Sequence, residues 1–219
     1  RRARPRPARP QGAAAMTALL LVRHAPTAWN AEGRLMGRAD PPLSAAGRTA
    51  LAAWRLPAAF ATAPILASPL RRARETAAAF GPATVEPRLI EMDWGAWEGH
   101  RLADLRQSDP AAVAAIEALG LDLEPPGGER PRDVAHRLAA LFTELAGTEL
   151  AGGARYVLVT HKGVQRAALA LATGWDYRTT SPLRLGAGDA LRIDLDPQGR
   201  PAPTVAAVPL QDRGAPCAC

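Results

Sequence analysis

The chain has 219 residues, 47% of them hydrophobic, which fits a single domain able to bury a core. Its formal net charge is +6, but five arginines lie in the first ten residues, and residues 16–219 hold 22 basic and 21 acidic side chains. This near-neutral remainder argues against a nucleic-acid-binding domain, whose basic patch lies on the fold itself. Apolar runs well short of the roughly 18 residues needed to span a bilayer argue against a membrane protein.

Both ends of the chain have the composition of tails. Residues 1–15 contain arginine, proline and alanine without periodicity, which predicts a disordered basic tail, and Met16 is a candidate natural start. Residues 211–219 predict a flexible C-terminal tail holding the only cysteines, Cys217 and Cys219. With no second cysteine pair, we expect no zinc site and a disulfide-free, cytoplasmic protein.

Strand-like and helix-like segments alternate along the remaining chain. Ser44 is a candidate N-cap, Pro69 suits an early helical position, and Gly174 suits a helix end. In chain order we predict strand Ala18–Val22, a helix from Ser44 toward Ala59, strand Pro64–Ser68, a helix from Pro69, strand Thr84–Arg88, helices Ala111–Leu119 and Arg132–Leu145, strand Arg155–Thr160, helix Val164–Thr173, and strands Ala190–Leu195 and Thr204–Val208.

This alternation predicts an α/β fold with three α/β/α layers and a mostly parallel sheet, formed by residues 16–210. The nearly all-apolar first and fourth strands fit positions covered on both faces of the sheet. Residues 91–130 interrupt the alternation and are rich in tryptophan, glycine and proline, which predicts a small helical cap over one sheet edge.

Unusual polar residues follow three of the predicted strands. The stretch "LVRHAPTAWN" places Arg23 and His24 at a strand end, "SPLRRARETA" places Arg72 after a second strand, and "VTHKGV" places His161 and Lys162 after a third. Ligands of open α/β sheets bind at the carboxyl ends of strands. Arginine forks and helix N-termini suit phosphate, and a neutral histidine can attack phosphorus. The sequence therefore predicts a phosphate site at this edge.

Four ordered motifs, the three above and "LIEMDWGAWEG", resemble those of the histidine phosphatase superfamily, also called phosphoglycerate mutase-like (branch 1). The resemblance covers roughly Ala18 to Leu195 and implies a phosphoglycerate mutase-like fold. It implies a phosphomonoester hydrolase that forms a phosphohistidine on a small phosphorylated metabolite. The implied catalytic residues are His24 (nucleophile), Glu91 (proton donor) and His161, and the implied phosphate-binding residues are Arg23, Thr27, Asn30 and Arg72.

The implied chemistry places demands on particular side chains. Glu91 must lie in a partly apolar environment to act as an acid near neutrality, and Trp94 and Trp97 are candidates to supply it. Since the cations are side chains, we expect no metal and no other cofactor. Lys162 is a further candidate phosphate contact, and Arg38 and Trp97 are candidate substrate-binding residues.

The chain departs from the family pattern at three positions. Ala25 replaces the usual glycine, and Lys162 follows His161 where a small residue is common. Arg130 stands where a serine would cap the next helix, so we expect the cap from elsewhere, with Asp133 a candidate.

Three alternatives to a general phosphatase remain open at this stage. A phosphoglycerate mutase is the nearest, although the short cap leaves water better access to the site. A non-catalytic phosphate-binding module and an anion-surface binder acting through the basic tail are the others. Within the phosphatases, the "RHAPT" motif resembles that of α-ribazole phosphatases.

Overall fold

The computed structural model describes residues 16–147 and 153–211 and shows one six-stranded sheet in the order β3-β2-β4-β1-β5-β6. The predicted tails lie outside these residues, apart from Gln211. Among the described strands, β5 alone runs against the others, since β1–β4, β4–β2 and β2–β3 pair in parallel. The strands are β1 Thr17–Arg23, β2 Ile65–Ala67, β3 Ala83–Val85, β4 Arg155–Thr160, β5 Asp189–Leu195 and β6 Pro201–Pro209.

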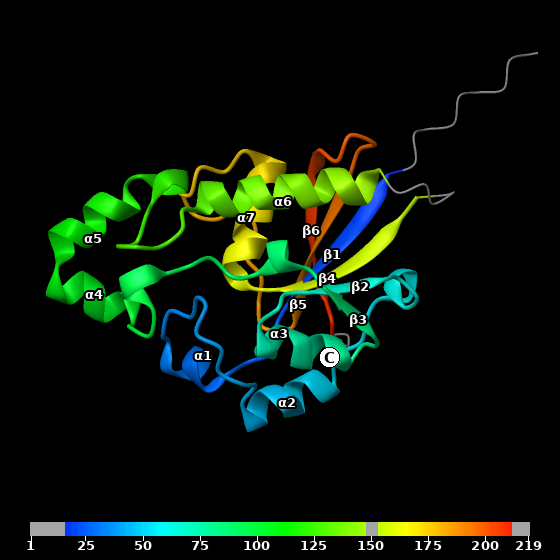
Figure 1. Ribbon diagram of the computed structural model, residues 1–219, viewed down its shortest axis with the longest axis horizontal. Coiled ribbons are helices and arrows are strands. Elements are labelled where there is room, and N and C mark those ends of the chain that lie inside the picture. Colours follow the sequence, from blue (N-terminus) through cyan, green and yellow to red (C-terminus); the bar gives the residue numbers. More distant parts are fainter. Residues whose placement is uncertain (1–15, 148–152, 212–219) are drawn as a thin grey trace, which may run out of the picture.

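Helices cover both faces of the sheet, which confirms the predicted α/β fold (Figure 1). They are α1 Ala28–Glu32, α2 Ala45–Ala52, α3 Arg71–Ala78, α4 Leu102–Ser108, α5 Pro110–Glu117, α6 Pro131–Ala146 and α7 Lys162–Thr173. Helices α6 and α7 lie on one face and α2 and α3 on the other, while α4 and α5 form a separate pair at the left of Figure 1.

Strand β1 explains why the molecule has two cores. Its side chains point alternately to opposite faces of the sheet, as the two-residue repeat of a strand requires. Leu19 and Leu21 pack with residues of α6 and α7, whereas Leu20 and Val22 pack with residues of α2 and α3. All four are fully buried, so this all-apolar strand anchors both halves of the fold.

The register of the strands places the predicted site residues side by side at the carboxyl ends of β1, β4 and β2. Arg23 of β1 pairs with Thr160 of β4, so the next residues, His24 and His161, leave neighbouring strands side by side. Ala67 of β2 pairs with Val159 of β4, which places Ser68 at the same edge. Neighbouring strands lie only about 4.8 Å apart, so the fold itself brings these side chains together.

Three predicted element boundaries differ in the structure. Helix α2 ends at Ala52, well before Ala59, and α3 begins at Arg71, so Pro69 lies outside it. Strand β3 ends at Val85 because Pro87, which has no N–H for the ladder, begins a short 3₁₀ turn.

Two predicted helix caps are present. Ser44 accepts a hydrogen bond from the Gly47 N–H at 2.9 Å and caps α2. At the start of α6, the Asp133 carboxylate accepts from the Arg130 N–H at 3.3 Å, which is the contact that the third helical residue makes back to the N-cap in a capping box.

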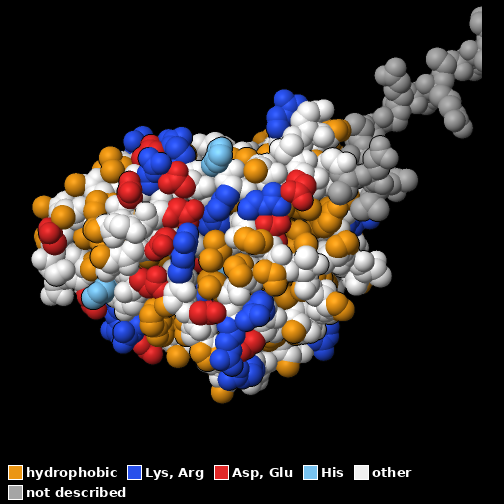
Figure 2. All heavy atoms as spheres, in the orientation of Figure 1, with side chains coloured by type: hydrophobic (Ala, Val, Ile, Leu, Met, Phe, Trp, Pro, Cys, Tyr) orange, Lys and Arg blue, Asp and Glu red, His pale blue; other side chains and the backbone are white. Residues whose placement is uncertain are grey.

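The surface carries mixed charge. On the face shown in Figure 2, basic and acidic side chains lie next to one another rather than in a single-sign patch. Within the described residues, every helix is too short or too polar to cross a bilayer.

Gly47 provides a test of how α2 packs on the loop that follows His24. A Cβ at Gly47 would lie 1.9 Å from the Pro26 carbonyl oxygen, a backbone atom that cannot rotate away. We expect Gly47→Ala to lower the free energy of unfolding by about 2 kcal/mol or more, despite alanine's better helix propensity.

The matched control is Gly147→Ala at the end of α6, where the nearest atoms to the new Cβ lie at 3.5 Å and φ is −76°. Its unfolding free energy should stay within about 1 kcal/mol of wild type. Urea denaturation measures both, and equal stability of the two variants would contradict the prediction.

Candidate active site

His24 is held as a neutral histidine at the end of β1. Its backbone N–H donates to the Thr160 carbonyl at 2.8 Å, and its ring Nδ1 lies 2.8 Å from the Ala25 carbonyl oxygen. Because a carbonyl oxygen only accepts, Nδ1 carries the proton and Nε2 keeps its lone pair. Burial, together with the charges of Arg23 and Arg72, lowers the pKa of His24 to about 3.

The backbone beside His24 is tied to α3. The Ala25 N–H donates to the Thr76 hydroxyl at 2.9 Å, and that hydroxyl donates to the Arg72 carbonyl at 2.7 Å. Ala25 is fully buried in the α2–α3 core and lies outside the positive-φ region, so this site does not need the family's glycine here. Thr76 was not predicted as a site residue; the one feature of the sequence that points to it is its place one helical turn after Arg72.

His161 lies beside His24 as predicted, with ring centroids 5.2 Å apart. Its Nε2 lies 2.7 Å from the Ser68 hydroxyl at the end of β2. Burial lowers the pKa of His161 well below its usual value, and the neighbouring His24 ring and the charges of Arg72 and Arg23 add to this effect. Ser68 was not predicted as a site residue. Its hydroxyl fixes the orientation of the His161 ring.

Arg72 is fully buried and clamps a neighbouring loop. Its Nη1 donates to the Ala39 carbonyl at 2.7 Å and its Nη2 to the Gly37 carbonyl at 2.8 Å. Asp40 lies 3.7 Å away. Glu98 holds the same loop from the other side, because its carboxylate accepts from the N–H groups of Arg38 and Ala39.

Three buried nitrogens of the site have no hydrogen-bond partner among the described residues. They are Nε of Arg23, Nε of Arg72 and Nδ1 of His161, and Trp54 supplies the one other such nitrogen. An unsatisfied buried polar group costs about 1–3 kcal/mol, so their concentration at one strand edge needs a compensating ligand. Donors on two arginines match the oxygens of a phosphate.

Glu91 is a buried carboxyl group held by backbone donors. It accepts from the Met92 N–H at 2.8 Å and from the Gly163 N–H at 3.2 Å. Burial raises its pKa, against the opposing effect of those hydrogen bonds and of Arg72 and Arg23. A Cβ at Gly163 would lie 2.4 Å from Glu91 Oε1, so the first turn of α7 needs glycine there.

Thr27 and Asn30 have different roles in the loop after His24. Asn30 Oδ1 accepts from the Thr27 N–H at 2.9 Å, and Thr27, the N-cap of α1, is buried. Asn30 lines the pocket described next, whereas Thr27 is not among its lining residues. Thr27 therefore shapes the loop that presents Asn30.

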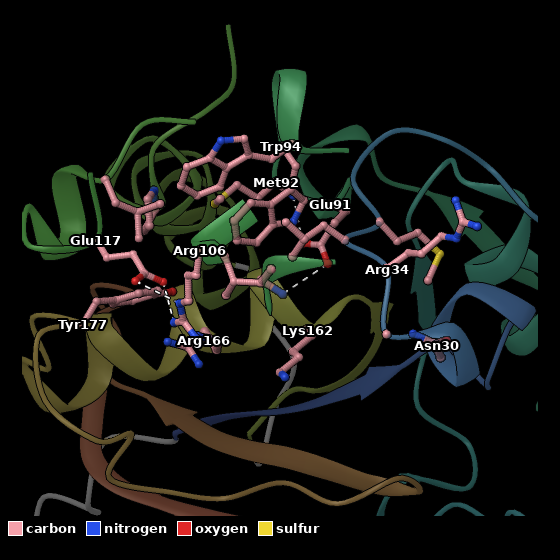
Figure 3. Close-up of a pocket in the computed structure, with 18 of the residues that line it drawn as sticks. Asn30, Arg34, Glu91, Met92, Trp94, Arg106, Glu117, Lys162, Arg166 and Tyr177 are labelled. Carbon is pink, nitrogen blue, oxygen red and sulfur yellow. Dashed lines mark hydrogen bonds and ion pairs between the residues drawn. The ribbon is translucent and has the colours of Figure 1, made fainter. Parts of the chain in front are cut away.

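A pocket of about 1040 Å³ connects these groups to the cap (Figure 3). Arg23, His24, Glu91, Trp97 and Lys162 line it, as predicted for a common site. Trp97 is buried and stacks on Trp94, with ring centroids 6.5 Å apart. The two tryptophans give the region around Glu91 an apolar wall.

Arg38 lies outside this pocket. Its guanidinium is 3.4 Å from Asp93 and 3.8 Å from Glu129, and it is absent from the pocket lining. Two carboxylates of the following segment hold this side chain, and its predicted contact with substrate stays a prediction.

The geometry is that of a site suited to holding a phosphoryl group beside a histidine. A neutral histidine with a free lone pair, two arginines and a buried acid supply nucleophile, charge and proton. Within the described residues, no group of three histidine, cysteine or acidic side chains is placed to hold a metal ion.

Comparison with known proteins identifies the family. Residues 19–205 match the histidine phosphatase superfamily (branch 1), and the chain belongs to it. It is 36% identical over 190 residues to a glucosyl-3-phosphoglycerate phosphatase of Mycolicibacterium vanbaalenii (81% of this chain, 83% of the relative). It is 34% identical over 161 residues to a metal-independent phosphoserine phosphatase of Arabidopsis thaliana (69% and 67%).

A solved structure agrees with this assignment. The chain is similar to an Escherichia coli protein described as a candidate alpha-ribazole-5'-P phosphatase, with a TM-score of 0.68 and 25% identity over 90% of this chain and 97% of that one. The phosphatase class and the α-ribazole phosphatase-like resemblance expected from the sequence are confirmed.

The lowered pKa of His24 predicts acid-sensitive stability. The unfolded chain protonates this residue near its ordinary pKa of 6.5, whereas the folded chain does so only at about 3. The stabilisation is therefore present above about pH 6.5 and is lost as the pH falls toward 3, by up to about 1.4 kcal/mol per pH unit.

We expect His24→Asn, which keeps a side-chain donor for the Ala25 carbonyl, to reduce the fall in unfolding free energy between about pH 7 and about pH 4. Urea denaturation at both pH values measures this. The control is His100→Asn, an exposed position that should leave the slope unchanged. An unchanged slope in His24→Asn would refute the assignment of a buried neutral histidine.

Proposed function

We propose that this protein hydrolyses small phosphate monoesters through a phosphohistidine at His24, without a metal ion. The observation that carries the proposal is the neutral His24 ring, whose Nδ1 proton is held by Ala25 and whose Nε2 is free. The unpartnered buried nitrogens of Arg23, Arg72 and His161 support a phosphate beside it.

The first step follows from these positions. Nε2 of His24 attacks phosphorus, and the bond to the ester oxygen breaks. Arg23, Arg72 and His161 stabilise the negative charge on the phosphoryl oxygens. Glu91, protonated because burial raises its pKa, gives its proton to the departing alkoxide.

The second step restores the enzyme. The Glu91 carboxylate takes a proton from water, whose oxygen attacks phosphorus, and the N–P bond to His24 breaks. Inorganic phosphate leaves, and both residues return to their starting protonation states. The Met92 and Gly163 N–H groups hydrogen bond to the Glu91 carboxylate, which supports its ionised form between the steps.

Residues 16–210 are the proposed phosphatase domain, with 91–130 as its cap and the cytoplasm as its compartment. The pocket volume of about 1040 Å³ and the small phosphorylated substrates in the names of its relatives support a small metabolite as the substrate. An α-ribazole phosphate is one candidate within that class.

The first test is hydrolysis of p-nitrophenyl phosphate in the presence of EDTA. We expect activity to resist the chelator and to fall by at least about 10³-fold in His24→Ala, since the nucleophile is lost. Acid-labile labelling of the wild type by radioactive phosphate, absent in the variant, identifies the covalent intermediate. Equal hydrolysis by both proteins would refute the role of His24.

A second test isolates the proton donated by Glu91. Glu91→Gln cannot protonate the leaving group, so kcat/KM for an alkyl phosphate such as glycerol 3-phosphate should fall by about 10²–10⁴-fold. The fall for p-nitrophenyl phosphate should be at least tenfold smaller, because nitrophenolate leaves without a proton. Since kcat/KM reports only steps up to the first irreversible one, later water activation does not obscure the comparison.

The role of Glu91 as an acid also determines how kcat/KM changes with pH. For glycerol 3-phosphate, kcat/KM should decrease as the pH rises through the raised pKa of Glu91, because the acid loses its proton. Equal losses for both leaving groups in Glu91→Gln would assign Glu91 to a role other than general acid.

A further inference from the structure

The main chain that follows β1 is fixed one residue at a time. The His24 N–H donates to the Thr160 carbonyl of β4 at 2.8 Å, and the Ala25 N–H donates to the Thr76 hydroxyl of α3 at 2.9 Å. The Ala25 carbonyl in turn lies 2.8 Å from Nδ1 of the His24 ring and accepts its proton. The residue that holds the His24 ring is therefore itself held by Thr76.

Pro26 makes this contact more important, because it removes a backbone donor from the next position. Proline has no N–H, so the peptide group between Ala25 and Pro26, whose carbonyl binds His24, has no donor of its own. Beyond that peptide group, the Pro26 carbonyl accepts from the Ser44 N–H at 3.0 Å. On the side toward His24, the Ala25 N–H is the nearest backbone donor, and its acceptor is Thr76.

The hydrogen bonds of the Thr76 hydroxyl have a fixed direction. The Ala25 N–H can only donate, so the hydroxyl oxygen accepts there. The Arg72 carbonyl can only accept, so the hydroxyl donates its one proton to it, at 2.7 Å. Thr76 is fully buried, where hydrogen bonds are stronger than in water. One hydroxyl thus joins the residue after His24 to the helical turn that carries the buried guanidinium of Arg72.

The bond at Nδ1 decides which nitrogen of the His24 ring is free to react. In a neutral imidazole one nitrogen carries the proton, and the partner of the other ring position selects which one. With its proton held on Nδ1 by the Ala25 carbonyl, the ring keeps a lone pair on Nε2. If Ala25 could turn, the two nitrogens would compete for the proton, and a protonated Nε2 has no lone pair with which to attack phosphorus.

Building on the proposed function, we propose that Thr76 is a positioning residue: its hydroxyl holds Ala25 so that the proton of His24 stays on Nδ1 and the lone pair of Nε2 is directed at phosphorus. Thr76 is not among the residues that line the pocket, so it acts through Ala25 and not on the substrate. Its effect therefore falls on the chemical step rather than on binding.

The central variant is Thr76→Val, which keeps the branched shape of the side chain and removes the hydroxyl. We expect kcat/KM for p-nitrophenyl phosphate to fall about 10- to 100-fold, since small misplacements of reacting groups have effects of this size. The inhibition constant of inorganic phosphate, which measures binding at the same site, should stay within about threefold of wild type. Thr76→Ser keeps the hydroxyl, and its kcat/KM should stay within about threefold of wild type.

A matched control is available on α7. The Thr173 hydroxyl also donates to the carbonyl four residues earlier, that of Leu169 at 2.8 Å, but it lies at the end of the helix away from His161. Thr173→Val therefore removes the same kind of helical hydrogen bond without touching the loop after His24, and its kcat/KM should equal that of wild type.

A second measurement reads the ring directly and needs no turnover. The chain has four histidines, so in protein labelled with ¹⁵N at histidine the ring signals of His24 are assigned by their loss in His24→Asn. At pH 7, where burial keeps this ring neutral, ¹⁵N chemical shifts distinguish the protonated nitrogen from the unprotonated one. We expect protonated Nδ1 in wild type and in Thr76→Ser, and a mixture of the two forms in Thr76→Val.

The outcomes separate this inference from the proposed function. A wild-type ring protonated on Nε2 refutes the inference, as does Thr76→Val with unchanged kcat/KM or unchanged ring shifts, or Thr76→Ser with losses as large as those of Thr76→Val. Thermal unfolding checks that each variant folds, and Thr76→Cys, whose thiol is a weak hydrogen-bonding group, replaces Thr76→Val under the same criteria if that variant does not fold. A wild type that hydrolyses no phosphate monoester contradicts the proposed function, whereas the ring shifts still decide whether Thr76 sets the protonation of His24.

Discussion

A fully buried guanidinium, that of Arg72, is the constraint around which the site is organised. A buried charge is costly unless hydrogen bonds satisfy it, and the carbonyls of Gly37 and Ala39 satisfy two of its nitrogens. The loop that supplies those carbonyls must therefore be fixed, and Glu98 fixes it through the next backbone N–H groups. The same charge helps to keep His24 neutral. One buried cation thus links the candidate phosphate site, the loop and the proposed nucleophile.

Burial raises the pKa of Glu91, whereas it lowers the pKa of His24. The two backbone donors to Glu91 come from the neighbouring Met92 and from Gly163 in the first turn of α7, 72 residues away. The backbone N–H groups of Met92 and Gly163 work against that shift. A carboxyl group balanced between these influences can hold a proton in one step and release it in the next. The site therefore depends on backbone placement as much as on the identity of the acid.

The sequence predicted the residues that stand at strand ends, because the order of strands and motifs is local information. His24 and His161 lie where predicted because each follows directly on an apolar strand, and Arg23 is the last residue of such a strand. Ser68 and Thr76 were missed because their roles arise from contacts 93 and 51 residues away along the chain. Nothing in a single sequence marks such partners.

The same physics explains what else the sequence did not show. Nothing in it revealed that Asp93 and Glu129 lie against Arg38. The end of α2 was extended toward Ala59 because alanine-rich segments suit helices, whereas the chain turns at Ala53 and Trp54 to pack the indole in the core. Local preference gave way in each case to tertiary contact.

Helix α7 combines two functions on a single rigid body. Its N-cap is His161, its first turn holds the acid through Gly163, and its buried side packs against the sheet through Val164, Ala167 and Ala168. Beyond Gly163, the side chains of α7 that line the pocket belong to Lys162 and Arg166, which take no part in that packing. Change at that surface can alter which molecules are accepted while the reacting groups keep their positions. The helix can therefore keep the reacting groups in place while its pocket-facing side chains vary, which suits a fold that hosts many different functions.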